Sequence, residues 1–417
     1  MLSKLKKDLS ITFLGSIINA VCNIIWLALI SREYGVEKYG IYVICQNLGV
    51  FIATFASVRT GDLIYKNHKE NSLYNFIKLF SFILTMVVSI LVFVACYSFI
   101  DYVSESIYSE IPKNMIVLSF VYIILFSFNN YALAILRCEG KFNTLVKVES
   151  TLKVIQLLTG VVLLNFTSLL SKVEYIFYIW FSFNSILQIV LIVFATKGVF
   201  NNFSFCDFKI NYLSNKDKIL NVLFHSNLLG YFKIATSPGD TFLIGLFAGA
   251  HQVAIYNVAL QVINIGVLVK NNLSNVLTAK IIQLYNGSIS TLKTFVFNYM
   301  AITSILSVLF ILFIWFLGKP ILDIFFGTQP DEILLLLVLM SFNYVITLIS
   351  LCYYPIALSA GDLKSRTILL TVKILFLISY ILLFELSAIA FVIIELVFSI
   401  IIRLINDYPL HKKVFHV

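Results

Sequence analysis

The chain has 417 residues, of which 60% are hydrophobic and 12% are charged, and its mean hydropathy is +0.96. So few charges cannot cover the surface of a water-soluble domain. The net charge of +9 comes from Lys and Arg that fall in alternate loops, which is the pattern of membrane topology and not of a nucleic-acid site. These values exclude a soluble enzyme and predict an integral membrane protein.

Apolar runs recur along the whole chain, and runs of about 18 to 25 apolar residues are long enough to cross a bilayer as helices. A membrane β-barrel would require alternation of polar and apolar residues, which the runs lack. We therefore predict an all-α fold of about twelve spans. In chain order they are 10–31, 40–60, 76–100, 114–136, 149–167, 174–196, 226–247, 252–273, 293–317, 331–353, 366–384 and 386–405.

Loop charges predict the orientation of these spans. The N-terminal segment and every second loop after it carry the basic residues, beginning with Lys4, Lys6 and Lys7. The first acidic loop, around Asp101 and Glu105, falls on the opposite side. Because basic loops stay in the cytoplasm, both termini are predicted to be cytoplasmic.

Two short segments indicate an internal duplication. Residues 35–42 and 249–256 both read Gly, four variable residues, a small residue and then Ile-Tyr, and each joins the first two spans of a half. Gly140 and Gly361 form a second matched pair, each in an inside turn after the fourth span of its half. We predict two six-helix lobes of equal orientation around a central cavity, with an N-terminal lobe at 1–200, a cytoplasmic linker at 201–225 and a C-terminal lobe at 226–417.

The segment Arg-Glu-Tyr-Gly-Val-Glu-Lys-Tyr-Gly-Ile-Tyr at 32–42 resembles the first-loop signature of polysaccharide exporters in the multidrug/oligosaccharidyl-lipid/polysaccharide superfamily. Asp240 followed by Gly249 is similar to the start of that family's second half. The turns 324–327 and 361–364 fit the family as well. The resemblance covers nearly the whole chain, and it is greatest to the flippases of O-antigen and other lipid-linked oligosaccharides.

The resemblance implies a V-shaped, MATE-like bundle in the bacterial inner membrane. It implies transfer of an undecaprenyl-diphosphate-linked oligosaccharide from the cytoplasmic to the periplasmic leaflet by alternating access. It further implies contact with membrane lipid, with a polysaccharide polymerase and with a chain-length regulator, and none with nucleic acid. No covalent step is needed, so the protein is expected to be a transporter and not an enzyme.

Polar residues inside the predicted spans are the candidates for substrate binding. Asn257, Gln261, Asn264 and Asn271 share one face of the eighth span, and Asn19 and Asn23 lie four apart on the first. Carboxamides both donate and accept hydrogen bonds, which suits sugar hydroxyls. Lys233 is the candidate cation for the diphosphate. The alternatives are hydrogen bonds between helices for the carboxamides and snorkelling to the interface for Lys233.

Three further residues are candidates for ion coupling or gating. Asp240 and Glu395 are acidic residues within spans and could bind H⁺ or Na⁺, and Arg32 is a candidate gate at the outside mouth. Each could instead make a structural ion pair. Glu149 and Lys153 are four residues apart, so they are expected to pair with each other near the inside surface.

Metal and cofactor sites are not expected. The six cysteines include no C-x-x-C pair, the five histidines include no H-x-x-x-H pair, and no nucleotide-binding motif is present. Two rival functions remain open at this stage. A drug/cation antiporter of the same superfamily would favour acidic cavity residues, and a membrane O-antigen polymerase or glycosyltransferase would need a long periplasmic loop. The outside loops predicted here are short.

Overall fold

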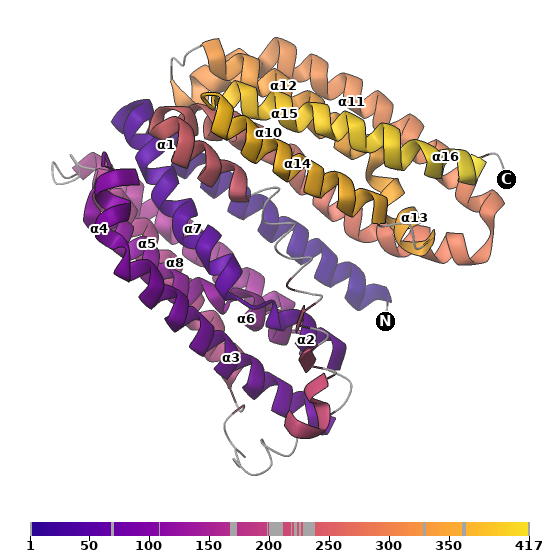
Figure 1. The fold of residues 1–417 in the computed structure, drawn as a ribbon, viewed down its shortest axis with the longest axis horizontal. Coiled ribbons are helices and arrows are strands. Elements are labelled where there is room, and N and C mark those ends of the chain that lie inside the picture. Colours follow the sequence, from indigo (N-terminus) through magenta and orange to yellow (C-terminus); the bar gives the residue numbers. More distant parts are fainter. Residues whose placement is uncertain are drawn as a thin grey trace. The chain divides into compact units, whose positions relative to one another are not determined.

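The computed structural model describes residues 2–67, 71–107, 109–166, 173–197, 199, 212–217, 219–220, 223–224, 227, 238–327, 331–360 and 364–415. Within these ranges the regular structure is helical, without a strand (Figure 1). The predicted all-α membrane fold is confirmed. The main helices are α1 (Leu2–Ala56), α2 (Thr60–Asn67), α3 (Asn71–Ser98), α4 (Ile100–Tyr102), α5 (Lys113–Ser127), α6 (Asn129–Cys138), α7 (Phe142–Phe166), α8 (Val173–Thr196), α10 (Pro238–Gly287), α11 (Ile289–Phe326), α12 (Asp331–Ile349), α13 (Tyr353–Ala360), α14 (Lys364–Leu383), α15 (Ala388–Ile402) and α16 (Tyr408–Phe415).

Eight helical segments among the described residues are long and apolar enough to cross a membrane. They are Leu14–Ala56, Leu73–Ser98, Lys113–Cys138, Val173–Thr196, Asp240–Asn264, Ile289–Phe326, Asp331–Ala357 and Ala388–Leu410. The first of them covers most of the predicted spans 10–31 and 40–60, and α7 and α14 cover the predicted spans 149–167 and 366–384 to within one residue. Large apolar side chains such as Trp315 and Phe316 are exposed along α11, as expected for a helix that faces lipid.

Helices α1 and α10 each consist of two helical arms that meet at a glycine. The backbone at Gly35 has φ 78° and ψ 173°, and the backbone at Gly249 has φ 81° and ψ 177°. Only glycine adopts this region without strain. These are the two glycines that open the predicted repeat, so the matched sequences give matched backbone turns. The second predicted pair cannot be compared in this way, because Gly361 lies outside the described residues.

The tyrosines that close the two repeat segments also occupy matching positions. Tyr42 packs edge-on against Phe177 of α8, with ring centroids 6.2 Å apart and planes at 79°. Tyr256 packs edge-on against Phe391 of α15, at 6.1 Å and 89°. In each half the second predicted span is therefore joined to the sixth by the same aromatic pair. Burial of such rings stabilises the contact beyond the area that it removes from solvent.

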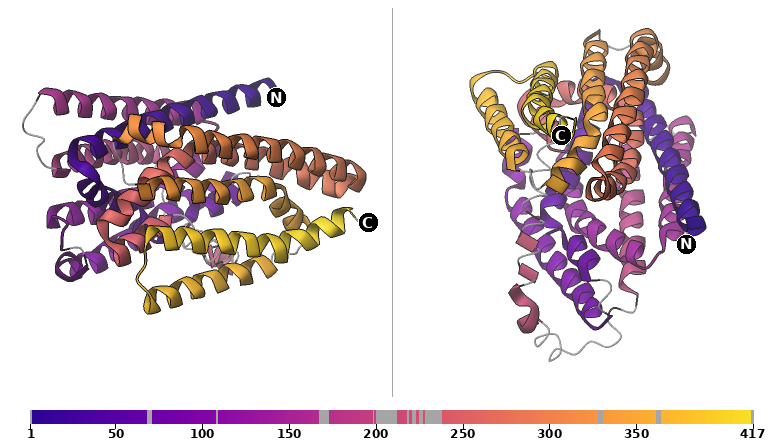
Figure 2. Two further views of the ribbon diagram at one scale, coloured as in Figure 1. Left: turned by 90° about the horizontal axis from the view of Figure 1, so that it is seen from above. Right: turned by 90° about the vertical axis from the view of Figure 1, so that its right-hand side faces the viewer.

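The chain forms two compact units, Met1–Leu246 and Phe247–Val417, and the division falls inside α10. In unit 1 an apolar core joins α2, α3, α6 and α8 around residues such as Leu63, Ile77 and Ile135. In unit 2, α11, α12 and α15 run side by side (Figure 2), and a core around Ile281, Val296 and Ile356 joins α10, α11 and α13. The predicted linker at 201–225 lies mostly outside the described residues.

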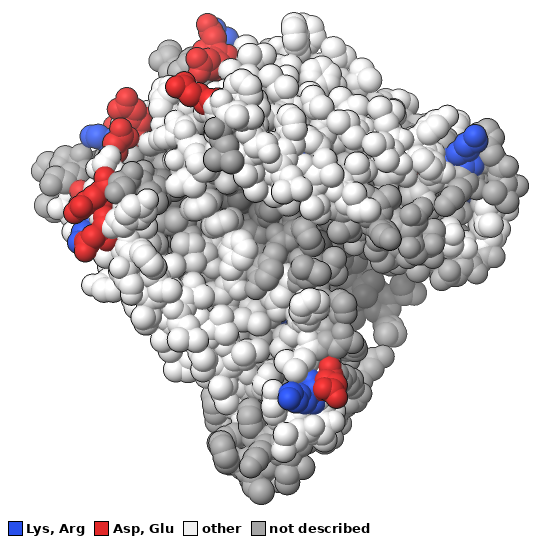
Figure 3. Space-filling view, in the orientation of Figure 1, with Lys and Arg blue, Asp and Glu red and all other residues white. Residues whose placement is uncertain are grey.

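Charged side chains are concentrated at helix ends. On the face shown in Figure 3, Lys, Arg, Asp and Glu gather near the ends of the helices, and the lengths between them are uncharged. Several of these terminal charges pair with one another, as Lys113 does with Asp101 and Lys319 with Asp331. The uncharged lengths match the hydrocarbon layer that the protein must cross.

Candidate functional site

Helices α1, α7 and α8 of unit 1 pack against one another and bring several polar side chains together. Two glycines fix how α1 lies beside α7. A Cβ atom on Gly15 would lie 2.2 Å from Val146 Cγ1, and one on Gly160 would lie 2.2 Å from the Trp26 ring. Residues 15 to 26 of α1 thus run alongside residues 146 to 160 of α7. Asn19 and Asn23 fall within this stretch, at the level of the polar residues of α7.

Lys153 of α7 is the cation of this region. Its ammonium donates to Asn184 Oδ1 at 3.1 Å and to Gln156 Oε1 at 3.4 Å. The predicted pairing of Lys153 with Glu149 is wrong: the two charges are near enough to attract each other, but no ion pair or hydrogen bond joins them in the described structure. The Lys153 ammonium bonds instead to one carboxamide of its own helix, Gln156, and to one of α8, Asn184.

The partner of Lys153 lies deep in the membrane-spanning part of the chain. Asn184 sits midway along α8 (Val173–Thr196), about 17 Å from either helix end at 1.5 Å per residue. Its side chain is 7% exposed, and its Nδ2 donates to the carbonyl of Trp180 at 2.8 Å. The Lys153 ammonium is thus held at mid-depth by neutral oxygens, an arrangement that is costly unless further polar groups surround it.

Further polar groups do line these three helices. Asn19 Oδ1 on α1, Ser150 Oγ on α7 and Gln188 Oε1 on α8 are buried and accept no hydrogen bond within the described structure. Gln188 lies one turn beyond Asn184 on the same face of α8. We call Asn19, Ser150, Lys153, Gln156, Asn184 and Gln188 the Lys153 cluster. A buried polar atom without a partner costs about 1 to 3 kcal/mol, which a bound polar ligand or water would offset.

The chemistry of the Lys153 cluster suits an anionic group with hydroxyls attached. An ammonium has three donors, and Lys153 uses two of them on carbonyl oxygens, so one donor remains for an anion. The carboxamides can both accept from and donate to hydroxyl groups. Sequence reasoning named Asn19 as a candidate ligand but assigned Lys153 to a pair with Glu149 near the inside surface. The signal that would have identified it is a lysine on the helix face that also carries Gln156 and Ser150.

The carboxamides predicted on the eighth span lie on α10 in unit 2. Asn257 is 4% exposed and donates within its own helix to the Val253 carbonyl at 3.3 Å, and Gln261 is 8% exposed. Asn264 is half-buried. Their role as sugar ligands stays a prediction. The predicted phosphate ligand Lys233 lies outside the described residues, as does the side chain of Asn271.

Glu395 of α15 has a partner that sequence reasoning did not name. It forms an ion pair with Lys373 of α14, and the two side chains are only 15% and 8% exposed. Asp240 is buried at 8% exposure, close in sequence to Phe242, whose ring stacks on Phe51 of α1 at 4.4 Å. Arg32 is exposed on α1, three residues before the Gly35 turn. The coupling and gating roles of Asp240, Glu395 and Arg32 stay predictions.

The sequence signature of the polysaccharide biosynthesis protein family matches residues 5–278. The chain belongs to this family. No curated relative matches it in sequence. The matched region contains α1, α7 and α8 almost entirely, so the Lys153 cluster lies within the part of the chain that defines the family assignment.

Solved structures of membrane transporters share the fold of this polysaccharide biosynthesis family member. The lipid II flippase MurJ in an inward closed conformation aligns with a TM-score of 0.66 at 12% identity, covering 97% of this chain and 87% of that one. A multidrug resistance MATE family transporter of the MOP superfamily, in an outward-facing conformation, aligns with a TM-score of 0.62 at 14% identity, covering 99% of this chain and 95% of that one. The MATE multidrug transporter DinF-BH aligns with a TM-score of 0.62 at 14% identity, covering 100% of this chain and 97% of that one. At these identities the likeness concerns the fold alone.

Proposed function

We propose that the protein is a flippase that moves a polyprenyl-diphosphate-linked oligosaccharide, such as an O-antigen repeat unit, from the cytoplasmic to the periplasmic leaflet of a bacterial inner membrane. Membership of the polysaccharide biosynthesis family supplies the substrate class, and the fold is that of MOP-superfamily transporters. The observation that carries the proposal is the Lys153 cluster, in which a half-buried cation and several carboxamides lie at membrane depth.

The chemistry of the substrate explains why such a cluster is needed. The diphosphate is an anion, and its transfer into hydrocarbon without a counter-charge is prohibitive. In the proposed mechanism the Lys153 ammonium donates its remaining N–H to a phosphate oxygen. The neighbouring carboxamides form hydrogen bonds with the sugar hydroxyls. The polyprenyl chain is apolar and stays in the lipid, so the protein has to shelter only the head group.

Transport would proceed by alternating access without a covalent step. The two units, with their matched turns at Gly35 and Gly249, would exchange inward-open and outward-open states. A proton or sodium gradient would bias the cycle, with Asp240 or Glu395 as the ion-binding group. Removal of the delivered lipid by a polymerase and a chain-length regulator would pull the cycle in the same direction.

The alternative function is export of cationic drugs, as in the multidrug transporters that share the fold. An ammonium at the centre of unit 1 disfavours it, because a cationic drug would meet a like charge there. Export of an anionic, hydroxyl-rich head group is instead favoured by the positive charge of Lys153. The rival polymerase or glycosyltransferase gains no support from the three solved structures named above, which are transporters and a flippase.

The test is to delete the gene and measure in which leaflet the lipid-linked oligosaccharide resides. We expect it to accumulate in the cytoplasmic leaflet, and we expect the wild-type gene to restore outward delivery. Lys153→Gln should restore less than about one tenth of that delivery, since a charge-assisted hydrogen bond contributes about 1.5 to 3 kcal/mol. Lys147→Gln is the matched control, because Lys147 is exposed on the same helix. Normal delivery in the deletion strain, with no second transporter present, would refute the proposal.

A further inference from the structure

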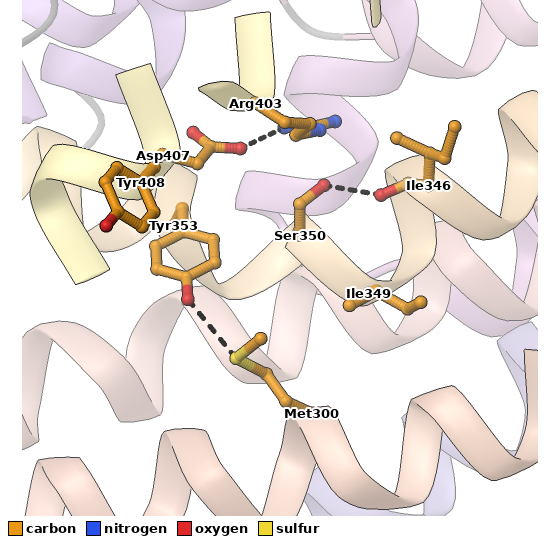
Figure 4. Close-up of a pocket in the computed structure, with 8 residues that line it drawn as sticks. All are labelled: Met300, Ile346, Ile349, Ser350, Tyr353, Arg403, Asp407 and Tyr408. Atoms are coloured by element: carbon orange, nitrogen blue, oxygen red, sulfur yellow. Dashed lines mark hydrogen bonds and ion pairs between the residues drawn. The ribbon is translucent and has the colours of Figure 1, made fainter. Parts of the chain in front are cut away.

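Unit 2 contains a pocket of about 450 Å³ at one end of its helices (Figure 4). This volume falls within the range of about 300 to 1,000 Å³ that is typical of ligand pockets. The pocket is lined by Met300, Ile346, Ile349, Ser350, Tyr353, Arg403, Asp407 and Tyr408. These residues come from α11, from the end of α12 with the turn and helix α13 that follow it, from the π-helical turn Arg403–Asp407, and from the start of α16.

One wall of the pocket is apolar, and its polar groups are already engaged. Tyr353 donates its hydroxyl to Met300 Sδ at 3.2 Å, and Ser350 donates to the Ile346 carbonyl at 2.7 Å. In Figure 4 Met300 and Ile349 lie farthest from Arg403 and Asp407, with Ser350 and Tyr353 between them. This wall therefore offers a surface for hydrocarbon and no donor for a polar ligand.

The opposite wall carries Arg403, whose guanidinium has hydrogen-bond donors without a partner in the described structure. Arg403 Nη1 donates to Asp407 Oδ2 at 2.5 Å, while Arg403 Nε is buried and has no partner within the described structure. A guanidinium has five N–H donors, so most of those on Arg403 remain available. Both oxygens of Asp407 already accept a hydrogen bond, the second from Asn406 Nδ2 at 2.9 Å. The pair occupies a π-helical turn, a feature that is frequent at functional sites.

The charges around the pocket do not balance. Lys270 of α10 lies close enough to Arg403 for the two positive charges to repel each other. Among the described side chains, Arg403 and Lys270 together carry two positive charges against the single negative charge of Asp407, so one positive charge remains. A surplus cation in a partly buried site favours a ligand with a net negative charge.

The depth of the pocket indicates where that ligand comes from. Ser350 and Arg403 lie within the last four residues of the predicted spans 331–353 and 386–405, so both lie near the same end of the spans. The loop charges predict that this end of the helices is cytoplasmic. A snorkelling arginine would turn its head group to water. Arg403 instead holds Asp407 and buries its Nε, with a side chain that is 19% exposed.

From these observations we propose that the pocket binds an anionic phospholipid of the inner leaflet. The phosphodiester would accept hydrogen bonds from the Arg403 guanidinium, with Lys270 adding to the attraction. One acyl chain would lie against Met300, Ile346 and Ile349. A zwitterionic lipid carries the same phosphate, but its head-group cation would meet the surplus positive charge, so it should bind less tightly. The site would make the stability of unit 2 depend on the lipid that surrounds it.

The experiment is native mass spectrometry and thermal unfolding of the full-length protein in detergent, titrated with defined lipids. We expect phosphatidylglycerol to bind at least about tenfold more tightly than phosphatidylcholine, because the choline cation would meet the surplus positive charge of the pocket. Arg403→Gln with Asp407→Asn removes both charges together and leaves no buried ion unpaired. This double variant leaves the surplus charge of Lys270 in place, so it should weaken the binding of both lipids, whereas Lys270→Gln removes the surplus charge and should bring the two affinities together. Arg137→Gln, an exposed cation of unit 1, should leave the preference unchanged.

The remaining arms distinguish the sources of the anion. A polyprenyl monophosphate that displaces phosphatidylglycerol at equal or lower concentration would show that the pocket belongs to the transported lipid and would overturn the proposal. Stabilisation by inorganic phosphate alone, to the same extent as by phosphatidylglycerol, would overturn it as well, because no acyl chain would then be needed. Equal binding of phosphatidylglycerol and phosphatidylcholine to the wild-type protein would also refute it.

Discussion

The ion pair between Lys373 and Glu395 gives a sharp prediction about the stability of unit 2. The pair joins α14 to α15 within predicted spans, and its side chains are 8% and 15% exposed. Water can therefore solvate neither charge well once its partner is removed. Breaking a buried pair by removing one partner costs about 3 to 5 kcal/mol, whereas an exposed pair is worth no more than about 1 kcal/mol.

Glu395→Gln and Lys373→Met should each lower the free energy of unfolding by about 3 to 5 kcal/mol, because each leaves one buried charge unpaired. The double variant removes both charges while roughly conserving volume, and it should be nearly as stable as the wild type. A double-mutant cycle measured by reversible unfolding in mixed micelles gives the coupling between the two residues. Single variants that unfold like the wild type would show that the charges are solvated and would refute this reasoning.

The same double variant tests whether Glu395 couples transport to an ion. If the pair is structural, the variant should fold and keep a gradient-dependent transport rate. If Glu395 carries the coupling ion, the variant should fold but transport at a rate that no longer changes with the gradient. Comparison of rates with and without an imposed proton or sodium gradient separates the two outcomes.

Three further outcomes follow from glycine positions and from the charge of Lys153. Gly35→Ala and Gly249→Ala should each lower the free energy of unfolding by about 1 to 3 kcal/mol, measured by thermal unfolding. A Cβ at either position meets no atom within 4 Å, so the penalty is one of backbone conformation alone. Unchanged stability in either variant would contradict the shared turn. Gly160→Ala should lower the free energy of unfolding by about 1 to 3 kcal/mol, because the added methyl group overpacks against the Trp26 ring. The same substitution made together with Trp26→Phe should cause a smaller loss. Lys153→Arg should retain more transport than Lys153→Met, since it keeps the positive charge; equal loss in both would argue against an anion ligand.

Much of the fold followed from elementary patterns in the sequence. Apolar length identified the membrane helices, and the repeated Gly-to-Ile-Tyr segments identified two turns that have nearly the same backbone angles. The repeat could be recognised because the turn at Gly35 and Gly249 needs a conformation that only glycine adopts.

The side-chain partners were harder to predict, because spacing along one helix says little about neighbouring helices. The four-residue spacing of Glu149 and Lys153 suggested a pair, but Lys153 found a closer acceptor in Asn184, which is 31 residues away. Glu395 likewise bonds to Lys373, 22 positions before it, across two helices. Contacts between helices depend on how the helices rotate about their axes, and that rotation is fixed by packing details such as Trp26 against Gly160.

The most direct test of the proposed function is transport by the purified protein in sealed proteoliposomes. A lipid-linked oligosaccharide would be placed in both leaflets, and the fraction accessible to an added glycosidase would be followed after an ion gradient is imposed. The proposal predicts that the wild-type protein and Lys147→Gln change this fraction, and that Lys153→Gln does so at least about tenfold more slowly. A wild-type protein that inserts and folds but leaves the fraction unchanged would contradict the proposal.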